Sequence, residues 1–362
     1  MRIAIFGVGL IGGSLALCFK NKPGLHVVGH SPRQSSVEKM LKREVVDEAT
    51  TSFEAAAVAA DVIFLCVPVG NLEDYLVRLN RLPLKEGCII TDVGSTKQAI
   101  MACAQTCLRP GVRFIGGHPM AGKEKSGIEA ASSYLFENAY YVLTPGDSAD
   151  EAAYGKLVEL LALTKAQIVR MNADMHDSIV GAISHLPHII AVALVNLVAG
   201  HDRRNHLYST LAAGGFRDLT RIASSDPIIW RDILASNRDV VLKLLHEWND
   251  EINRFMKLIE ENDGAGIERE FVAANRFRSE LPERRKGVLT AMFDIYVEVP
   301  DQPGIIGKIA SHLGDHKINL SNIQIMESRL DVPGALRLTF REEEDMAKAA
   351  ELIKQMGCNV HY

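Results

Sequence analysis

Arg2-Ile3-Ala4-Ile5-Phe6-Gly7-Val8-Gly9-Leu10-Ile11-Gly12 is the stretch that decides the expected fold of the first part of the chain. Residues 2 to 6 are a short apolar run typical of a strand, and residues 14 to 19 continue as a helical pattern. A strand, a GxGxxG loop and a helix in this order predict a dinucleotide-binding unit. The glycines provide a tight turn, room for a pyrophosphate and close packing of helix on strand. The candidate cofactor residues of this loop are Gly7, Gly9, Leu10, Ile11 and Gly12.

Further strand patterns extend this unit into a doubly wound α/β domain of the Rossmann type. They lie at residues 26 to 29, 61 to 69, 87 to 97, 112 to 115, 139 to 143 and 167 to 171. The nicotinamide half of a dinucleotide usually passes the loop that ends the stretch at residues 61 to 69, so Val67 and Pro68 are further cofactor candidates. The loop at residues 94 to 97 ends in small polar residues and Lys97, which we expect to meet cofactor or substrate. The domain is predicted to span residues 1 to 171.

The loop after the second strand bears on the choice between NAD and NADP. An acidic residue there would bind the ribose hydroxyls of NAD, but this chain has Ser31-Pro32-Arg33 and no carboxylate. Ser31 and Arg33 suit a 2′-phosphate, because the guanidinium matches phosphate geometry. Alternatively, Arg33 stacks on the adenine or points to water. The residues favour NADP slightly and leave NAD open.

Gly116-Gly117-His118-Pro119-Met120-Ala121-Gly122 follows a strand pattern and places a histidine at the end of the predicted sheet. We expect the flanking glycines to let the backbone bend sharply and approach a ligand closely. Pro119 restricts the backbone directly after the histidine. His118 is therefore a candidate general base, and the alternative is a surface loop histidine.

From residue 174 the pattern becomes helical, with helices expected at residues 176 to 200, 227 to 262 and 265 to 280. Ser184 and His188 share one helix face, and Pro187 between them predicts a bend there. Ser184 and His188 either line a cavity or are core residues that hydrogen-bond to backbone carbonyls. Asp226-Pro227 is a helix start. The large apolar surface fits a dimer interface or an internal bundle core.

Residues 214 to 227 carry Arg217, Asp218 and Arg221 beside two glycines. Arginine grips a carboxylate through two parallel hydrogen bonds, so one of the two arginines is a candidate substrate anchor. The alternative is a structural pair between an arginine and Asp218 or Asp226.

After a charged linker at residues 283 to 290, strands and helices alternate as βαββαβ from residue 291 to 362. This order within so short a segment predicts a small ferredoxin-like unit. The chain thus has three predicted domains, the second being a helical domain at residues 172 to 282, for which the resemblance described below implies substrate binding and dimerisation.

Composition excludes several classes of protein. The 362 residues carry a net charge of -5, which gives no electrostatic basis for binding nucleic acid or an anionic membrane. The six cysteines lack metal-type CxxC spacing, no HExxH motif occurs, and no metal site is expected. No secretory signal precedes the first strand, and the longest apolar run, residues 189 to 198, is too short to span a bilayer. A cytoplasmic location with reduced thiols is expected.

Several of these stretches together resemble the prephenate dehydrogenase family of tyrosine biosynthesis, along essentially the whole chain. They are GVGLIGGS at 7 to 14, DVGSTK at 92 to 97, GGHPMAGKEKSG at 116 to 127, SHLPH at 184 to 188 and GGFRDLTRIASSDPIIWRDI at 214 to 233. DQPG at 301 to 304 and INLSNI at 318 to 323 resemble an ACT domain. A dehydrogenase followed by an ACT domain is similar to the Gram-positive type.

The resemblance implies oxidative decarboxylation of prephenate to 4-hydroxyphenylpyruvate, with hydride transfer to NAD or NADP. His118 falls on the family's catalytic histidine, and Ser95 on the serine that orients it and contacts cofactor and substrate. Arg221 falls on the arginine that binds a substrate carboxylate. Further positions fall on the pocket or near its mouth, partly from a partner subunit, which implies a homodimer: Ser184, His188, Glu124, Asp218 and Trp230. NAD is the cofactor usual for relatives with an ACT domain.

The ACT domain implies an amino-acid effector, with L-tyrosine expected, bound between paired ACT units. The candidate regulatory residues are Asp301, Gly304, Asn319 and Asn322. A dimerisation module without ligand is the alternative for this domain. Arogenate dehydrogenase, and in another class a non-catalytic amino-acid and dinucleotide sensor, are the alternatives for the whole chain.

Overall fold

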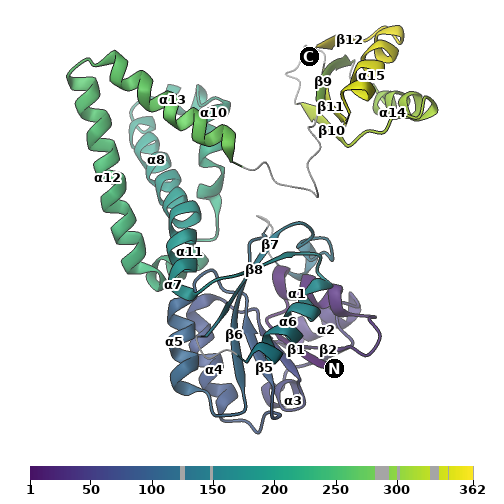
Figure 1. The fold of residues 1–362 in the computed structure, drawn as a ribbon, viewed down its shortest axis with the longest axis vertical. Helices are drawn as coiled ribbons and strands as arrows, with labels where there is room; N and C mark the ends of the chain where they lie inside the picture. Colours follow the sequence, from purple (N-terminus) through teal and green to yellow (C-terminus); the bar gives the residue numbers. More distant parts are fainter. Residues whose placement is uncertain are drawn as a thin grey trace. The chain divides into compact units, whose positions relative to one another are not determined.

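The computed structural model describes residues 1–122, 127–146, 150–281, 293–299, 302–326, 334–340 and 342–361 (Figure 1). The chain divides into two compact units, Met1–Ser279 and Glu280–Tyr362. The first unit contains an α/β part followed by a helical part, and the second contains a small sheet with two helices. The predicted linker at residues 283 to 290 lies outside the described residues.

The α/β part is built on an eight-stranded sheet in the order β3-β2-β1-β4-β5-β6-β7-β8. Neighbouring strands are parallel except β6 and β7, which pair antiparallel. The strands are β1 (Arg2–Phe6), β2 (His26–His30), β3 (Glu48–Thr50), β4 (Val62–Leu65), β5 (Ile89–Asp92), β6 (Arg113–Pro119), β7 (Tyr140–Pro145) and β8 (Gln167–Arg170). The strand order reverses beside β1, where ligands bind in folds of this class. The predicted Rossmann-type fold is confirmed.

Two apolar clusters cover the two faces of this sheet, because its central strands are apolar on both sides. One cluster holds residues of α1 (Leu10–Phe19), α2 (Gln34–Lys42) and α6 (Glu151–Ala162). The other holds residues of α3 (Phe53–Ala57), α4 (Leu72–Asn80) and α5 (Gln98–Cys107). Short 3-10 turns, η1 (Val69–Asn71) and η2 (Ile128–Ala130), complete this part.

The helical part begins with one continuous helix made of α7 (Ala173–Val180), the π-helical segment η3 (Gly181–His185) and α8 (Leu186–Asp202). The backbone N–H of Leu186 donates to Gly181 O, five residues earlier, as in a π turn. Pro187 therefore follows a widened turn and does not end the helix. Over its 30 residues this helix has a mean hydropathy of 1.9 in its most apolar window, of which 22% is buried. By length and composition alone this helix could cross a membrane, although the uninterrupted apolar run at residues 189 to 198 is too short to do so.

The remaining helices are α9 (Leu207–Thr210), α10 (Gly214–Thr220), η4 (Arg221–Ser224), α11 (Pro227–Ser236), α12 (Arg238–Glu260) and α13 (Gly264–Glu280). Asp226 caps α11 by accepting from the N–H groups of Ile228 and Ile229 at 2.9 and 3.0 Å, so the predicted helix start is confirmed. The single helix expected at residues 227 to 262 is broken at Asn237, whose backbone leaves helical geometry. The Asn237 side chain instead bonds to α7 and η3.

The second unit has a four-stranded antiparallel sheet in the order β10-β11-β9-β12. Its elements are β9 (Phe293–Val299), α14 (Ile305–Asp315), β10 (Asn322–Met326), β11 (Gly334–Phe340), α15 (Glu343–Gln355) and β12 (Asn359–His361). One core of its own, including Val297, Leu313 and Ile353, joins sheet and helices. The predicted βαββαβ order is confirmed.

Candidate active site

The carboxyl ends of the parallel strands bring the predicted cofactor residues and His118 to one edge of the sheet. Gly7 follows β1, Ser31 follows β2, Val67 and Pro68 follow β4, and Ser95 follows β5. His118 lies near the carboxyl end of β6, which runs parallel to β5. Residues far apart in the sequence therefore share the edge at which this fold class binds its ligands.

The glycine loop fits a dinucleotide phosphate. Gly7 has a φ of 89°, and a Cβ there would lie 2.4 Å from Cys66 O. A Cβ on Gly12 would lie 2.3 Å from Gly7 O, so this glycine permits the close packing of α1 on the loop. A Cβ on Gly9 would meet nothing within 4 Å, and no side chain caps the N-terminus of α1. The N-terminus of α1 therefore leaves room at Gly9 for a phosphate, which the N–H groups of a helix end can bind.

The residues expected to discriminate between NAD and NADP lie directly before α2. The backbone N–H of Arg33 donates to Ser31 Oγ at 3.3 Å, and the Arg33 side chain is exposed. An exposed guanidinium at this place is available to a phosphate or an adenine face.

The glycines beside His118 lie inside β6, so the expected sharp bend was wrong. His118 pairs with Val142 of β7, and Gly116 and Gly117 continue the same antiparallel ladder. A Cβ on Gly116 would lie 2.3 Å from Thr144 Oγ1, and one on Gly117 would lie 2.6 Å from Asp92 O. These glycines are required because neighbouring atoms come close, and neither has a positive φ.

His118 is held by a chain of hydrogen bonds that sequence reasoning missed. Its Nδ1 lies 2.8 Å from Nε2 of His176, and Nδ1 of His176 lies 2.7 Å from Oδ1 of Asp177. His176 and Asp177 are fully buried, whereas His118 is half-buried. Asp177 also accepts from the backbone N–H groups of Lys97 and Gln98 at 2.8 and 2.9 Å. The sequence signal that could have found this chain is the adjacent pair His176-Asp177 near the start of a predicted helix.

The surroundings of His118 disfavour its charged form. Burial lowers its pKa well below the usual 6.5, and the imidazole of His176, the ammonium of Lys97 and the imidazole of His185 lower it further. His118 is consequently a neutral imidazole at neutral pH.

Lys97 does not reach toward a ligand, so its expected role was wrong. Its side chain is fully buried, and its Nζ forms an ion pair with Oδ2 of Asp92. Asp92 is fully buried too and accepts from the N–H groups of Gly94 at 2.8 Å and Gly117 at 3.0 Å. The DVGSTK stretch is therefore tied to β6 through Asp92.

The helical part contributes a group of rings. His188 stacks on Trp230 with ring centroids 3.7 Å apart, and its Nδ1 lies 2.8 Å from Ser184 O. His185 is buried and its Nδ1 lies 3.1 Å from Nδ2 of Asn237. Burial lowers the pKa of His185 to about 4 and that of His188 below its usual value. His185 is thus a satisfied core histidine, while His188 and Ser184 remain partly exposed.

The arginine stretch is exposed to solvent. Arg217 and Asp218 lie on α10, Arg221 begins η4, and all three are exposed. Arg217 donates through Nε to Ala212 O at 3.1 Å, and Asp226 caps α11, so the structural pair considered between Arg217 and Asp226 does not form. Glu124 lies outside the described residues.

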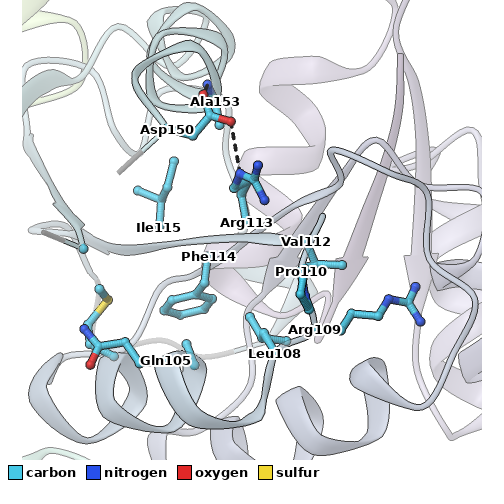
Figure 2. Close-up of a pocket in the computed structure, with 13 residues that line it drawn as sticks. Gln105, Leu108, Arg109, Pro110, Val112, Arg113, Phe114, Ile115, Asp150 and Ala153 are labelled. Carbon is cyan, nitrogen blue, oxygen red and sulfur yellow. Dashed lines mark hydrogen bonds and ion pairs between the residues drawn. The ribbon is translucent and has the colours of Figure 1, made fainter. Parts of the chain in front are cut away.

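A cavity of about 640 Å³ lies on another side of the sheet, between α5, β6 and α6 (Figure 2). Arg113, at the start of β6, forms an ion pair with Asp150 at 3.0 Å, and the ring of Phe114 lies on the other side of the strand. His118 lies toward the opposite end of β6. None of the predicted site residues lines this cavity.

In the second unit, Gly304 adopts a φ of 87° as the N-cap of α14, which a residue with a side chain rarely does. Asn319 precedes β10 and Asn322 begins it, whereas Asp301 lies outside the described residues. His312 and His316 lie on and directly after α14, with ring centroids 4.8 Å apart. Among the described residues, no three metal-ligating side chains gather into a site.

Comparison with known proteins supports this architecture part by part. Residues 15–170 match the prephenate dehydrogenase nucleotide-binding domain, residues 172–273 the prephenate dehydrogenase dimerization domain, and residues 293–358 the ACT domain. The chain is 41% identical to the prephenate dehydrogenase of Bacillus subtilis over 97% of its own length and 95% of that protein.

Two solved structures are similar to the first unit. The arogenate dehydrogenase of Synechocystis is 33% identical, with a TM-score of 0.69 over 78% of this chain and 100% of that one. The prephenate dehydrogenase of Aquifex aeolicus, in complex with hydroxyphenyl propionate and NAD+, is 30% identical, with a TM-score of 0.69 over 77% of this chain and 98% of that one. From the near full-length match and the three domain matches, the chain belongs to the prephenate dehydrogenase family.

Proposed function

We propose that this chain catalyses the oxidative decarboxylation of prephenate to 4-hydroxyphenylpyruvate, with His118 as general base and NAD(P)+ as hydride acceptor. The observation that carries the proposal is the position of His118, at the carboxyl edge that also bears the dinucleotide loop. Family membership supports the same reaction.

The hydrogen-bond chain behind His118 determines which ring nitrogen acts. Asp177 Oδ1 is an acceptor, so His176 donates to it through Nδ1–H and keeps a lone pair on Nε2. That lone pair accepts from Nδ1–H of His118. The proton of neutral His118 thus resides on Nδ1, and Nε2 is the basic nitrogen. His176 and Asp177 hold the ring in this tautomer, as orienting carboxylates do in other enzymes.

A neutral base at working pH suits the chemistry. His118 takes the proton of the substrate hydroxyl through Nε2, while the hydroxyl-bearing ring carbon loses hydride and the ring carboxylate leaves as carbon dioxide. Its lowered pKa keeps Nε2 unprotonated at pH 7. The same surroundings make Nε2 a weaker proton acceptor than a free imidazole.

The cofactor accepts the hydride when bound, and the chain supplies its cradle. Gly7, Gly9, Leu10, Ile11 and Gly12 would hold its phosphates, and Val67, Pro68 and Ser95 would contact its nicotinamide half. NAD is the cofactor we propose, in line with the NAD+ bound to the Aquifex aeolicus relative. Ser31 and Arg33 leave use of NADP to be measured.

Substrate binding is assigned to the helical part. Arg221 is proposed as the carboxylate anchor, because its exposed guanidinium can form two parallel bonds with a carboxylate. The remaining pocket residues proposed are Ser184, His188, Glu124, Asp218 and Trp230. The stack of His188 on Trp230 forms a flat wall suited to a cyclic substrate.

Assembly and regulation follow from the other two matched domains. The helical part exposes many large apolar side chains, including Ile183, Leu197, Ile259 and Phe271, and a homodimer would cover them. This also accounts for the exposed apolar helix Ala173–Asp202 without a membrane. We propose L-tyrosine as effector of the ACT domain, with Asp301, Gly304, Asn319 and Asn322 at its site. A cytoplasmic location fits the free cysteines of the described chain.

Initial rates test the proposal directly. NAD and NADP are each assayed with prephenate and with arogenate, with and without tyrosine. We expect steady reduction of NAD with prephenate, faster than with arogenate, and inhibition by tyrosine. A preference for arogenate would assign the Synechocystis protein's activity instead. No steady turnover with either substrate would leave the sensor alternative.

A further inference from the structure

Two buried charges beside His118 have no part in the reaction described above. Asp92, the last residue of β5, and Lys97, just before α5, are both 0% exposed. Removing both charges from water costs several kcal/mol for each ion, and the pair regains this only when further hydrogen bonds satisfy it. A buried ion pair is therefore weak evidence for a stabilising role. The role of Asp92 and Lys97 is better inferred from the residues that they contact.

Asp92 connects the loop that carries Ser95 to the strand that carries His118. Its Oδ2 accepts from Gly94 N–H at 2.8 Å and pairs with Lys97 Nζ. Its Oδ1 accepts from Gly117 N–H at 3.0 Å. Gly94 directly precedes Ser95, and Gly117 directly precedes His118. One carboxylate thus fixes the backbone beside both residues.

Lys97 is connected to His118 through Asp177 and His176. Its backbone N–H donates to Oδ1 of Asp177, the oxygen that also holds His176. The Lys97 side chain also packs against β6, because a Cβ on Gly116 would lie 3.0 Å from Lys97 Cδ. The same residue therefore touches the strand of His118 and the hydrogen-bond chain behind its ring.

We propose that Asp92 and Lys97 are positioning residues, which hold His118 and Ser95 at a fixed separation and place a cation behind the imidazole. The inference rests on the proposed role of His118 as base. It extends that role by assigning the DVGSTK stretch a task beyond contact with ligands.

The electrostatic part has a definite sign. Lys97, His176 and His185 face His118 and disfavour its protonation, while Asp177 lies beyond His176 and Asp92 is paired with Lys97. Removing the ammonium alone takes away a cation and leaves the Asp92 carboxylate unpaired. Both changes raise the His118 pKa. Removing both charges cancels most of that rise.

The experiment compares K97M, the charge-free double variant D92N/K97M and the parent, each as the full-length chain. The His118 pKa is measured by NMR on protein with 13C-labelled histidine, with the resonance assigned through H118N. Turnover and KM are measured with NAD and prephenate. The control is D61N/K85M, a pair at 2.9 Å in which Asp61 also accepts a backbone N–H, from Arg2, at the other edge of the sheet.

We expect K97M to raise the His118 pKa and the double variant to raise it less. In both, kcat should fall by about 10- to 100-fold with KM for NAD within about twofold, because the base is displaced from the hydroxyl. The control should keep the parent's pKa and kcat. A folded K97M with the parent's pKa and kcat would overturn the inference. Should K97M not fold, the same outcome in the double variant overturns it.

The design separates this inference from the function it rests on. NMR reports the His118 pKa without any turnover. If that pKa moves as expected but the acid limb of the kcat/KM profile does not follow it, His118 is not the base, although the pair still acts on its imidazole.

Discussion

The surroundings of His118 and of Arg221 differ in nearly every physical respect. His176, Asp177, Asp92 and Lys97 are all 0% exposed, and each has hydrogen-bond partners of fixed geometry. Arg221 lies in an exposed stretch, after an α-helix of only seven residues. The chemical half of the proposed site is thus completed by folding, whereas the binding half stays open to water.

The difference has a physical reason. Buried polar groups must be satisfied within the fold, so they form a rigid network and need no rearrangement when the reaction occurs. Arg221 is exposed, so a ligand carboxylate can reach its guanidinium from solvent. If the helical part pairs with a second copy, the open half also becomes less exposed.

The largest expected effect is the loss of the base. H118N should reduce kcat by about 10²- to 10⁴-fold, because the amide cannot take the hydroxyl proton. Binding of NAD, measured by calorimetry, should remain, since the dinucleotide loop is untouched. H26N is the matched control, because His26 is half-exposed and starts β2 at the opposite edge. Full activity of H118N would remove the proposed mechanism.

The second expected effect concerns stability in the buried half. K97M leaves the Asp92 carboxylate buried without its cation, which should lower the free energy of unfolding by about 3–5 kcal/mol. K39M removes one partner of the exposed Lys39–Glu129 pair at 3.2 Å, and should cost about 0–1 kcal/mol. Urea unfolding of both variants measures the contrast. Equal losses of unfolding free energy in K97M and K39M would mean that the buried pair contributes no more to stability than the exposed pair.

The third expected effect belongs to the open half. R221A should raise KM for prephenate by about 10- to 100-fold, the worth of a charge-assisted hydrogen bond, with little change in kcat. R217A is the control, because Arg217 donates to Ala212 O within its own segment. An unchanged KM in R221A would exclude this arginine as the carboxylate anchor and leave the binding half without an assigned cation.

The same contrast explains what the sequence could predict. Local patterns decided the strand and GxGxxG loop at β1, the Asp226 cap and the βαββαβ order of the second unit. The partners of Lys97 and His118 lie at Asp92, His176 and Asp177, and no local pattern relates β5, β6 and α7. Whether a histidine is a base or a core residue depends on such long-range contacts.

The glycines before His118 were misjudged for a related reason. Gly116 and Gly117 suggested a turn, but atoms of β5 and β7 require them inside β6. Pro187 suggested the loss of a helix hydrogen bond, and the helix continues through it behind the π segment Gly181–His185. Glycine permits several backbone forms, and its neighbours in space select among them.

The smallest expected effect is the response of the buried half to acid. His185 has its pKa lowered to about 4 by burial, against an ordinary value of 6.5. Between these values the unfolded chain binds a proton at this residue and the folded chain does not, so stability falls as pH drops from about 6.5 toward about 4. The loss is at most about 1.4 kcal/mol per pH unit for one proton. H185Q keeps an acceptor for Asn237 and should reduce the slope of unfolding free energy against pH in this window. A slope in H185Q identical to the parent's would mean that His185 is accessible to water in solution. The buried part of the site would then include His118 and its hydrogen-bond partners but not His185.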